Sequence, residues 1–213
     1  MIKFLIVRHG NSMSNLSKTF TGHKNSPLSE LGFKQAELTC DYIYQNYKVD
    51  AIYSSDLLRT VDTVKPLSQK TGIEIITDKN LREMYGGKWE GMLFSEIPEK
   101  YPEDFKVWKE TVGLARCTGG ESYEEVQKRA IDCINIIASK NEGKTVVVST
   151  HGGIIRAFEC AVRGIPLIRM DEVPSVFNAS VSEINYLNGR FEIVKTNISE
   201  HLADVLTAMP KGI

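Results

Sequence analysis

Two stretches, Phe4-Leu-Ile-Val-Arg-His-Gly10 and Thr145-Val-Val-Val-Ser-Thr-His-Gly-Gly153, decide the fold. Each begins with a short, continuous apolar run and ends in His-Gly. Such a run indicates a strand that is buried on both faces, as in a parallel sheet covered by helices. The two stretches therefore predict central strands of an α/β sheet.

The segments between these two runs alternate between helix and strand. Apolar residues at helical spacing predict a helix over 29–47, with Ser29 as its N-cap. A short strand at 51–53 is followed by a helix at 56–69 and by another strand at 74–77. This alternation is typical of strands joined by crossover helices.

The same alternation continues toward the C-terminus. The sequence Ser122-Tyr-Glu-Glu125 fits a capping box that starts a helix over 122–137. A second helix is expected over 153–163, with Gly164 after its last residue. The strands at 180–187 and 190–196 flank Asn188-Gly189, a strong hairpin signal. We therefore predict a three-layer α/β/α fold whose mostly parallel sheet has an antiparallel edge strand.

Residues 81–120 interrupt this pattern. Glycines and prolines punctuate short helical pieces there, including Gly86-Gly87, Pro98, Pro102 and Gly119-Gly120. We interpret this stretch as a small helical lid inserted into one domain that spans residues 1–213. The length of 213 residues suits one sizeable core.

Composition excludes several classes of protein. The 26 Lys and Arg residues balance 27 Asp and Glu residues, so nothing favours a nucleic-acid partner. The four cysteines show no C-x-x-C spacing, which argues against zinc and a redox pair and fits reduced thiols in a cytoplasmic protein. The apolar run at 1–7 is too short for a signal sequence, and no run approaches the ~18 apolar residues of a membrane span.

Four basic side chains are expected at one edge of the sheet. Arg8 and His9 follow one buried strand, His151 follows another, and Arg59 lies one turn into the helix after a third. Ligands of open α/β sheets bind beyond the carboxyl ends of the strands. One such residue alone is more often structural. Four together are not, because removing a cluster of basic side chains from water costs free energy unless an anion binds to it. A phosphoryl group matches arginine forks and helix N-termini.

The chemistry of such a cluster is phosphoryl transfer. A neutral imidazole can attack phosphorus, while cationic neighbours stabilise the developing charge. An acid outside the cluster must protonate the leaving oxygen. We select Glu83, because it opens the irregular region above the strand ends.

These residues belong to a longer set of motifs. The set comprises Arg8-His9-Gly10 with Asn15, Phe20-Thr-Gly22, Leu28-Ser-Glu-Leu-Gly-Phe-Lys-Gln-Ala36, Ser54-Ser-Asp-Leu-Leu-Arg59-Thr60, Leu81-Arg-Glu83, Gly87-Lys-Trp-Glu-Gly91, Gly119-Gly-Glu-Ser122 and His151-Gly-Gly153. In this order, over residues 1 to about 200, the chain resembles the histidine phosphatase superfamily, also called phosphoglycerate mutase-like. The resemblance implies the fold predicted above and a chemistry that uses no metal and no cofactor.

The resemblance also implies roles for single residues. His9 becomes the phosphohistidine; Arg8, Arg59 and His151 hold the phosphoryl group, and Glu83 donates the proton. Binding residues are Asn15, Thr21, Gly22 and the Gly152 backbone. His23 and His201 match no catalytic position, and Trp89 and Trp108 are expected to pack in the core, with Trp89 as a candidate for shaping the entrance.

The superfamily contains phosphatases and cofactor-dependent mutases. The mutase pattern has Arg-His after the acidic residue, an Arg-Arg pair in the insertion, and Asn after the second His-Gly. Here Met84-Tyr85 follows Glu83, the insertion has only scattered basic residues at 100, 106, 109 and 116, and Gly153 follows Gly152. We therefore expect a metal-independent phosphomonoesterase acting on a small phosphorylated metabolite.

Other functions stay open at this point: a phosphoglycerate mutase, a catalytically silent phosphate-binding module and, least favoured beside two arginines, a metal-dependent hydrolase. The expected partners exclude nucleic acid and membranes. The hairpin around Asn188-Gly189 leaves monomer or homodimer open, since an exposed edge strand can pair with a second copy.

Overall fold

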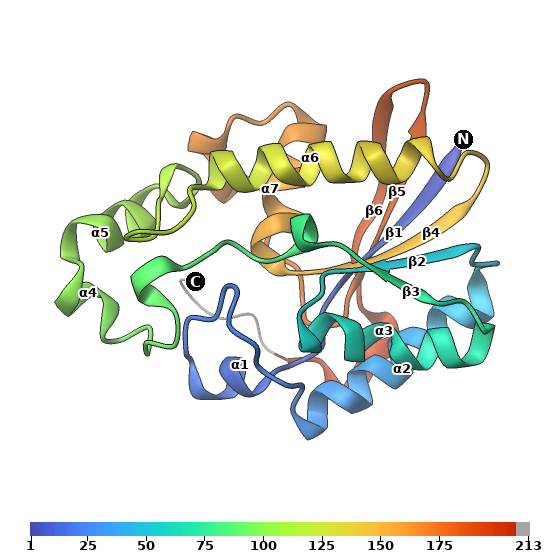
Figure 1. Cartoon of the computed structure of the whole chain (residues 1–213), viewed down its shortest axis with the longest axis horizontal. Helices are drawn as coiled ribbons and strands as arrows, with labels where there is room; N and C mark the ends of the chain where they lie inside the picture. The colour runs from blue at the N-terminus through green and yellow to red at the C-terminus, as the bar shows by residue number, and fades with distance from the viewer. Residues whose placement is uncertain (208–213) are drawn as a thin grey trace.

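The two stretches that end in His-Gly form neighbouring strands at the centre of the molecule. The computed structural model describes residues 1–207, so residues 208–213 of the predicted domain lie outside the described residues. The sheet has the order β3-β2-β4-β1-β5-β6 (Figure 1). Its strands are β1 (Ile2–Arg8), β2 (Ala51–Ser54), β3 (Ile75–Thr77), β4 (Thr145–Thr150), β5 (Val181–Leu187) and β6 (Arg190–Ile198).

The strand directions confirm a mostly parallel sheet with an antiparallel edge. β1 and β2 pair in parallel with β4, and β2 pairs in parallel with β3. β5 pairs antiparallel with both β1 and β6. β5 therefore runs against the five other strands of the described sheet.

Helices cover both faces of this sheet (Figure 1). α2 (Glu30–Asn46) and α3 (Leu58–Thr71) lie on one face, while α6 (Tyr123–Ser139) and α7 (Gly152–Arg163) lie on the other. Along β1, Phe4 and Ile6 pack into the larger core under α6 and α7, whereas Leu5 and Val7 pack into the core under α2 and α3. This alternation explains the uninterrupted apolar run and confirms the three-layer fold.

The signals for helix ends and the hairpin predict the local structure well. Ser29 caps α2, and Ser122 forms a capping box with Glu125 at the start of α6. Gly164 ends α7 with φ 66°. The hairpin turn between β5 and β6 has φ 51° at Asn188 and 79° at Gly189, the left-handed conformation that this dipeptide favours.

One helix near the site escaped the sequence analysis. α1 (Met13–Ser17) has five residues and begins with a capping box between Ser12 and Asn15. It contains no buried residue. A short polar helix without an apolar stripe gives no periodic signal.

The insertion packs as part of the larger core. It contains η1 (Lys79–Leu81), η2 (Gly87–Trp89), α4 (Ile97–Lys100), α5 (Pro102–Glu110) and η3 (Val112–Leu114). Trp89 is fully buried, and its ring centroid lies 5.6 Å from those of both Phe20 and Trp108. The insertion thus sits on an aromatic cluster that is continuous with the core under α6 and α7.

Two short elements complete the described chain, η4 (Leu167–Glu172) and η5 (Glu200–Val205). None of the helices within residues 1–207 has the length and apolar character needed to cross a membrane.

Candidate active site

The register of the central strands brings the two His-Gly motifs together. Arg8 on β1 is paired with Thr150 on β4, so His9 and His151 leave the sheet at the same edge. Their ring centroids lie 5.2 Å apart. The two His-Gly motifs therefore meet at one edge of the sheet, as the sequence predicts.

His9 is buried and has a defined tautomer. Its Nδ1 lies 2.7 Å from the carbonyl oxygen of Gly10. Because a carbonyl only accepts, Nδ1 carries the hydrogen and Nε2 keeps its lone pair. Burial, followed by the charges of Arg59 and Arg8, holds the pKa of His9 well below its ordinary 6.5. His9 is thus a neutral imidazole with a free Nε2.

The two arginines are fixed by backbone carbonyls. Arg8 donates through Nη1 to the Val176 carbonyl, while its buried Nε has no partner among the described residues. Arg59 is 1% exposed and donates through Nη1 and Nη2 to the carbonyls of Lys24, at 3.1 Å, and Gly22, at 2.8 Å. Burial lowers the pKa of Arg59 to about 10 and also lowers that of Arg8, so both stay charged near neutral pH. The fold thus holds two cations beside His9, Arg59 buried and Arg8 partly buried.

His151 lies next to His9, but both of its nitrogens are engaged. Arg59 Nε donates to Nδ1 over 3.2 Å, so Nε2 carries the hydrogen and donates to Ser55 Oγ at 3.0 Å. Burial, with the charge of Arg59 second, holds its pKa well below 6.5. Contact between His151 and a phosphoryl group remains a prediction, and it requires the ring to release Ser55.

Asn15 and Gly152 offer hydrogen-bond donors. The Oδ1 of Asn15 accepts from the Ser12 N–H at 3.0 Å and from Asn178 Nδ2 at 3.3 Å, which leaves the Asn15 amide nitrogen free to donate. Gly152 is the first residue of α7, where backbone N–H groups and the helix dipole favour an anion. Both residues can therefore bind phosphoryl oxygens.

Glu83 reaches the same place from the start of the insertion. Its Oε1 accepts from the Met84 N–H and its Oε2 from the Gly153 N–H, both at 2.9 Å. A Cβ on residue 153 would lie 2.4 Å from Glu83 Oε1, so the glycine makes room for the carboxyl group. The carboxyl group is thus tied to the first turn of α7, beside Gly152.

These groups surround a cavity of about 140 Å³. Seven predicted residues line it: Arg8, His9, Asn15, Thr21, Arg59, Glu83 and Gly152. His151 lies behind this lining, as does Gly22, whose carbonyl holds Arg59. We call Arg8, His9, Asn15, Arg59 and Gly152 the phosphoryl end of the cavity.

Part of the cavity lining comes from the insertion. Met84, Phe94 and Trp108 belong to this part, and we call these three residues the insertion wall. Trp89 is fully buried and does not line the cavity, so the expectation that it shapes the entrance was wrong. The expected core tryptophan Trp108 reaches the cavity instead, because α5 turns one edge of the aromatic cluster toward it.

Sequence reasoning missed several residues around the cavity. Ser55 holds His151, and Asn178 donates to the His9 carbonyl at 3.0 Å. Arg156 and Tyr123 line the cavity from α7 and α6. Arg156 lies one turn beyond His151-Gly-Gly153 on the helix that starts at the site. Ser55 and Tyr123 belong to the motifs Ser54-Ser-Asp-Leu-Leu-Arg59-Thr60 and Ser122-Tyr-Glu-Glu125. Asn178 lies in no motif and becomes visible only in the folded chain.

The two remaining histidines lie outside the cavity lining, as expected. His201 approaches Thr39 Oγ1 at 3.0 Å and stacks on Tyr42, with ring centroids 4.7 Å apart. His23 contacts the backbone of Glu83. In residues 1–207, no group of three or more His, Cys, Asp or Glu side chains is arranged to hold a metal ion.

Comparison with known proteins agrees with this geometry. Residues 4–199 match the family model of the histidine phosphatase superfamily (branch 1). Phosphoserine phosphatase 1 of Hydrogenobacter thermophilus is 35% identical over 213 residues, which is 100% of each chain. The metal-independent phosphoserine phosphatase of Arabidopsis thaliana is 29% identical and covers 95% of this chain and 84% of its own.

Solved structures give the same result. YhfR of Bacillus stearothermophilus superimposes with a TM-score of 0.91 at 28% identity, covering 95% of this chain and all of its own. The family match extends over nearly the whole chain, and the cluster around His9 occupies the place that its motifs predict. The chain belongs to branch 1 of the histidine phosphatase superfamily.

Proposed function

We propose that this protein is a phosphomonoesterase that hydrolyses a small phosphorylated metabolite through a phosphohistidine at His9. The observation that carries the proposal is the tautomer of His9, whose Nε2 lone pair is free in a cavity that Arg8 and Arg59 also line. Phosphatases among the relatives support the reaction class.

The first step transfers the phosphoryl group to the protein. His9 Nε2 attacks phosphorus, the Nε2–P bond forms, and the bond between phosphorus and the ester oxygen breaks. Arg8, Arg59 and the Asn15 amide neutralise the charge on the phosphoryl oxygens. Glu83 in its protonated form gives its proton to the departing alcohol.

The second step returns the enzyme to its starting state. Glu83, now a carboxylate, takes a proton from a water molecule, whose oxygen attacks phosphorus. The Nε2–P bond breaks, and inorganic phosphate leaves. One group therefore acts first as acid and then as base, as its position beside Gly152 allows.

The insertion wall favours a phosphatase over a mutase. A mutase must hold a phosphoglycerate while the phosphoryl group returns, which requires additional cationic donors. Apart from the proton donor Glu83, the residues that the insertion adds to the cavity are apolar: Met84, Phe94 and Trp108. Its basic residues Lys100, Lys106, Lys109 and Arg116 are absent from the lining of the described cavity.

The cavity also has polar lining residues outside the phosphoryl end, and they suit a substrate that carries a carboxylate. Arg156 donates through Nε to the Val173 carbonyl at 2.7 Å and through Nη2 to the Met170 carbonyl at 2.9 Å, while its Nη1 has no partner within residues 1–207. Ser175 and Tyr123 line the cavity beside it. We therefore propose phosphoserine, the substrate in the names of two relatives, as the first compound to test.

The experiment compares three phosphate esters in the presence of a chelator: phosphoserine, phosphoethanolamine, which lacks the carboxylate, and p-nitrophenyl phosphate. We expect turnover of all three, with the highest kcat/KM for phosphoserine. No turnover of any of them from mildly acidic to neutral pH would leave a silent phosphate-binding module, and loss of activity only in the chelator would indicate a metal hydrolase. Interconversion of 3-phosphoglycerate and 2-phosphoglycerate faster than hydrolysis would indicate a mutase.

We propose a cytoplasmic location, which is supported by four free, buried cysteines. Monomer or homodimer remains a prediction. Light scattering of the purified chain distinguishes the two.

A further inference from the structure

Glu83 stands where the chain leaves the α/β core and enters the insertion. Its carboxyl group is fixed by two N–H groups, one of them its neighbour's. The direction of the carboxyl group therefore depends on how the backbone of residues 80–85 is held. This backbone is held by residues that do not line the cavity.

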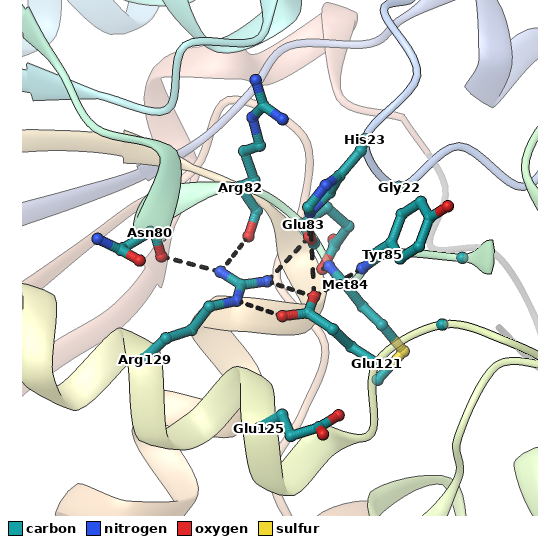
Figure 2. Close-up of polar contacts among 12 residues, drawn as sticks. Gly22, His23, Asn80, Arg82, Glu83, Met84, Tyr85, Glu121, Glu125 and Arg129 are labelled. Atoms are coloured by element: carbon teal, nitrogen blue, oxygen red, sulfur yellow. Dashed lines mark hydrogen bonds and ion pairs between the residues drawn. The ribbon is translucent and has the colours of Figure 1, made fainter.

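Arg129 on α6 makes most of the hydrogen bonds that hold this backbone (Figure 2). Its Nη1 donates to the carbonyls of Asn80 at 2.8 Å and Arg82 at 2.6 Å, and its Nη2 donates to the Glu83 carbonyl at 2.9 Å. One guanidinium thus binds three carbonyl groups in four consecutive residues. A planar fork restrains this segment in a way that a single donor cannot.

Glu121 fixes the guanidinium in turn. Its Oε1 accepts from Arg129 Nε at 2.8 Å, and its Oε2 accepts from Arg129 Nη2 at 3.0 Å and from the Tyr85 N–H at 2.7 Å (Figure 2). Burial alone would raise the pKa of Glu121, but the bonds from Arg129 and Tyr85 outweigh burial and leave this pKa below 4.5. The Glu121–Arg129 pair is therefore ionised, and it holds residues 80–85 from both ends.

His23 adds a third contact to the same backbone. Its Nε2 lies 3.0 Å from the Glu83 carbonyl, which therefore accepts from both His23 and Arg129. The His23 ring also approaches that of Tyr85, with centroids 5.1 Å apart. The histidine that matches no catalytic position thus has a structural place directly behind Glu83.

We propose that Arg129 and Glu121 are positioning residues that hold Glu83 in line with the leaving oxygen of the substrate. This inference rests on the proposed function, in which Glu83 is the proton donor. Neither residue lines the cavity, so both act through the backbone of residues 80–85. Without the fork, three carbonyls lose their cationic donor, and a misplacement of about 1 Å can reduce a rate roughly 100-fold.

The test separates positioning from simple support of the fold by changing the leaving group. Phenyl phosphate has a poor leaving group that needs a proton, whereas p-nitrophenyl phosphate has a good one. For R129Q we expect kcat/KM to fall roughly 10- to 100-fold for phenyl phosphate and less than about 3-fold for p-nitrophenyl phosphate. R116Q is the matched control: Arg116 lies in the insertion and contacts Gly120 and Glu125 rather than residues 80–85.

A double variant makes the result decisive. In the E83Q background, R129Q is expected to lower kcat/KM for phenyl phosphate by less than about 2-fold, because the group that Arg129 positions can no longer donate. A loss of equal size in both backgrounds, or an equal loss for both esters, would overturn the proposal and leave Arg129 with a structural role only.

Two more conservative variants keep the test valid if R129Q does not fold. R129K keeps a charge but lacks the fork, and E121Q keeps the shape of its side chain but weakens the hold on Arg129. Both are expected to show the same dependence on the leaving group in smaller degree, and its absence from both folded variants would also contradict the proposal. Failure of the proposed function looks different, since wild-type protein would then hydrolyse neither ester, or E83Q would affect both esters equally.

Discussion

The phosphoryl end and the insertion wall line the same cavity, but they differ in chemical character and in the elements that build them. The phosphoryl end comes from the end of β1 and the starts of α1, α3 and α7, and it consists of charged and polar groups, of which His9 and Arg59 are buried. The insertion wall comes from an irregular segment and presents Met84, Phe94 and Trp108. The core strands and helices therefore supply the groups around phosphorus, whereas the insertion supplies the proton donor Glu83 at its start and an apolar surface beyond it.

The largest effect is expected when one guanidinium is removed from the phosphoryl end. In R59K, a single ammonium replaces a guanidinium that binds both the loop carbonyls and His151. We expect kcat/KM for p-nitrophenyl phosphate to fall roughly 100- to 1000-fold, since a lysine does not reproduce the planar fork. R163K is the control, because Arg163 is ion-paired with Glu159 at 3.5 Å and lies outside the cavity. A loss below about 3-fold in R59K would show that charge alone is sufficient.

A change in the insertion wall should affect only one half of the reaction. F94A removes apolar contact with the alcohol part of the substrate, so kcat/KM is expected to fall about 10-fold. The hydrolysis of the phosphoenzyme should keep its rate, because the alcohol has already left. Single-turnover measurement of phosphoenzyme decay checks this, and a decay slowed as much as kcat/KM would contradict the division.

The smallest effect concerns stability against pH. The pKa of His9 lies well below its ordinary 6.5, so the folded state stays neutral while the unfolded chain takes up a proton as the pH falls through 6.5. Between about pH 7.5 and 5.5, this linkage should remove about 1.4 kcal/mol of unfolding free energy. Urea unfolding should show this difference between wild-type protein and H9Q, whereas F94A should follow the wild-type pH dependence. Identical pH dependence in wild type and H9Q would mean that His9 protonates normally in the fold.

Much of the fold followed from short signals in the sequence. The buried runs placed β1 and β4, and Ser29, Ser122 and Gly164 marked helix ends within two residues of their observed positions. His9 and Arg59 met at one edge, since parallel strands bring their carboxyl ends together. These signals are local, or they depend only on the topology of the sheet.

The rest depends on contacts between distant segments. Ser55 lies in the motif that contains Arg59 and Asn178 lies in none, but for both residues the partner is set by packing. Trp89 and Trp108 are both tryptophans of the insertion, and the sequence does not show which of them reaches the cavity. In the folded chain it is Trp108, on α5. The grip of Arg129 on residues 80–85 likewise has no sequence signature, because its acceptors are backbone carbonyls.

The most direct test of the account is to trap the phosphoenzyme and locate its phosphoryl group. Protein quenched within milliseconds of mixing with excess phosphoserine, or with p-nitrophenyl phosphate as a second substrate, should carry one acid-labile, alkali-stable phosphoryl group. Mass spectrometry should place it on the peptide that contains His9, and H9A should carry none while H201Q labels like the wild type. A label that persists in H9A, or wild-type turnover of both esters with no labelled protein at any time, would contradict the assignment of His9 as the nucleophile.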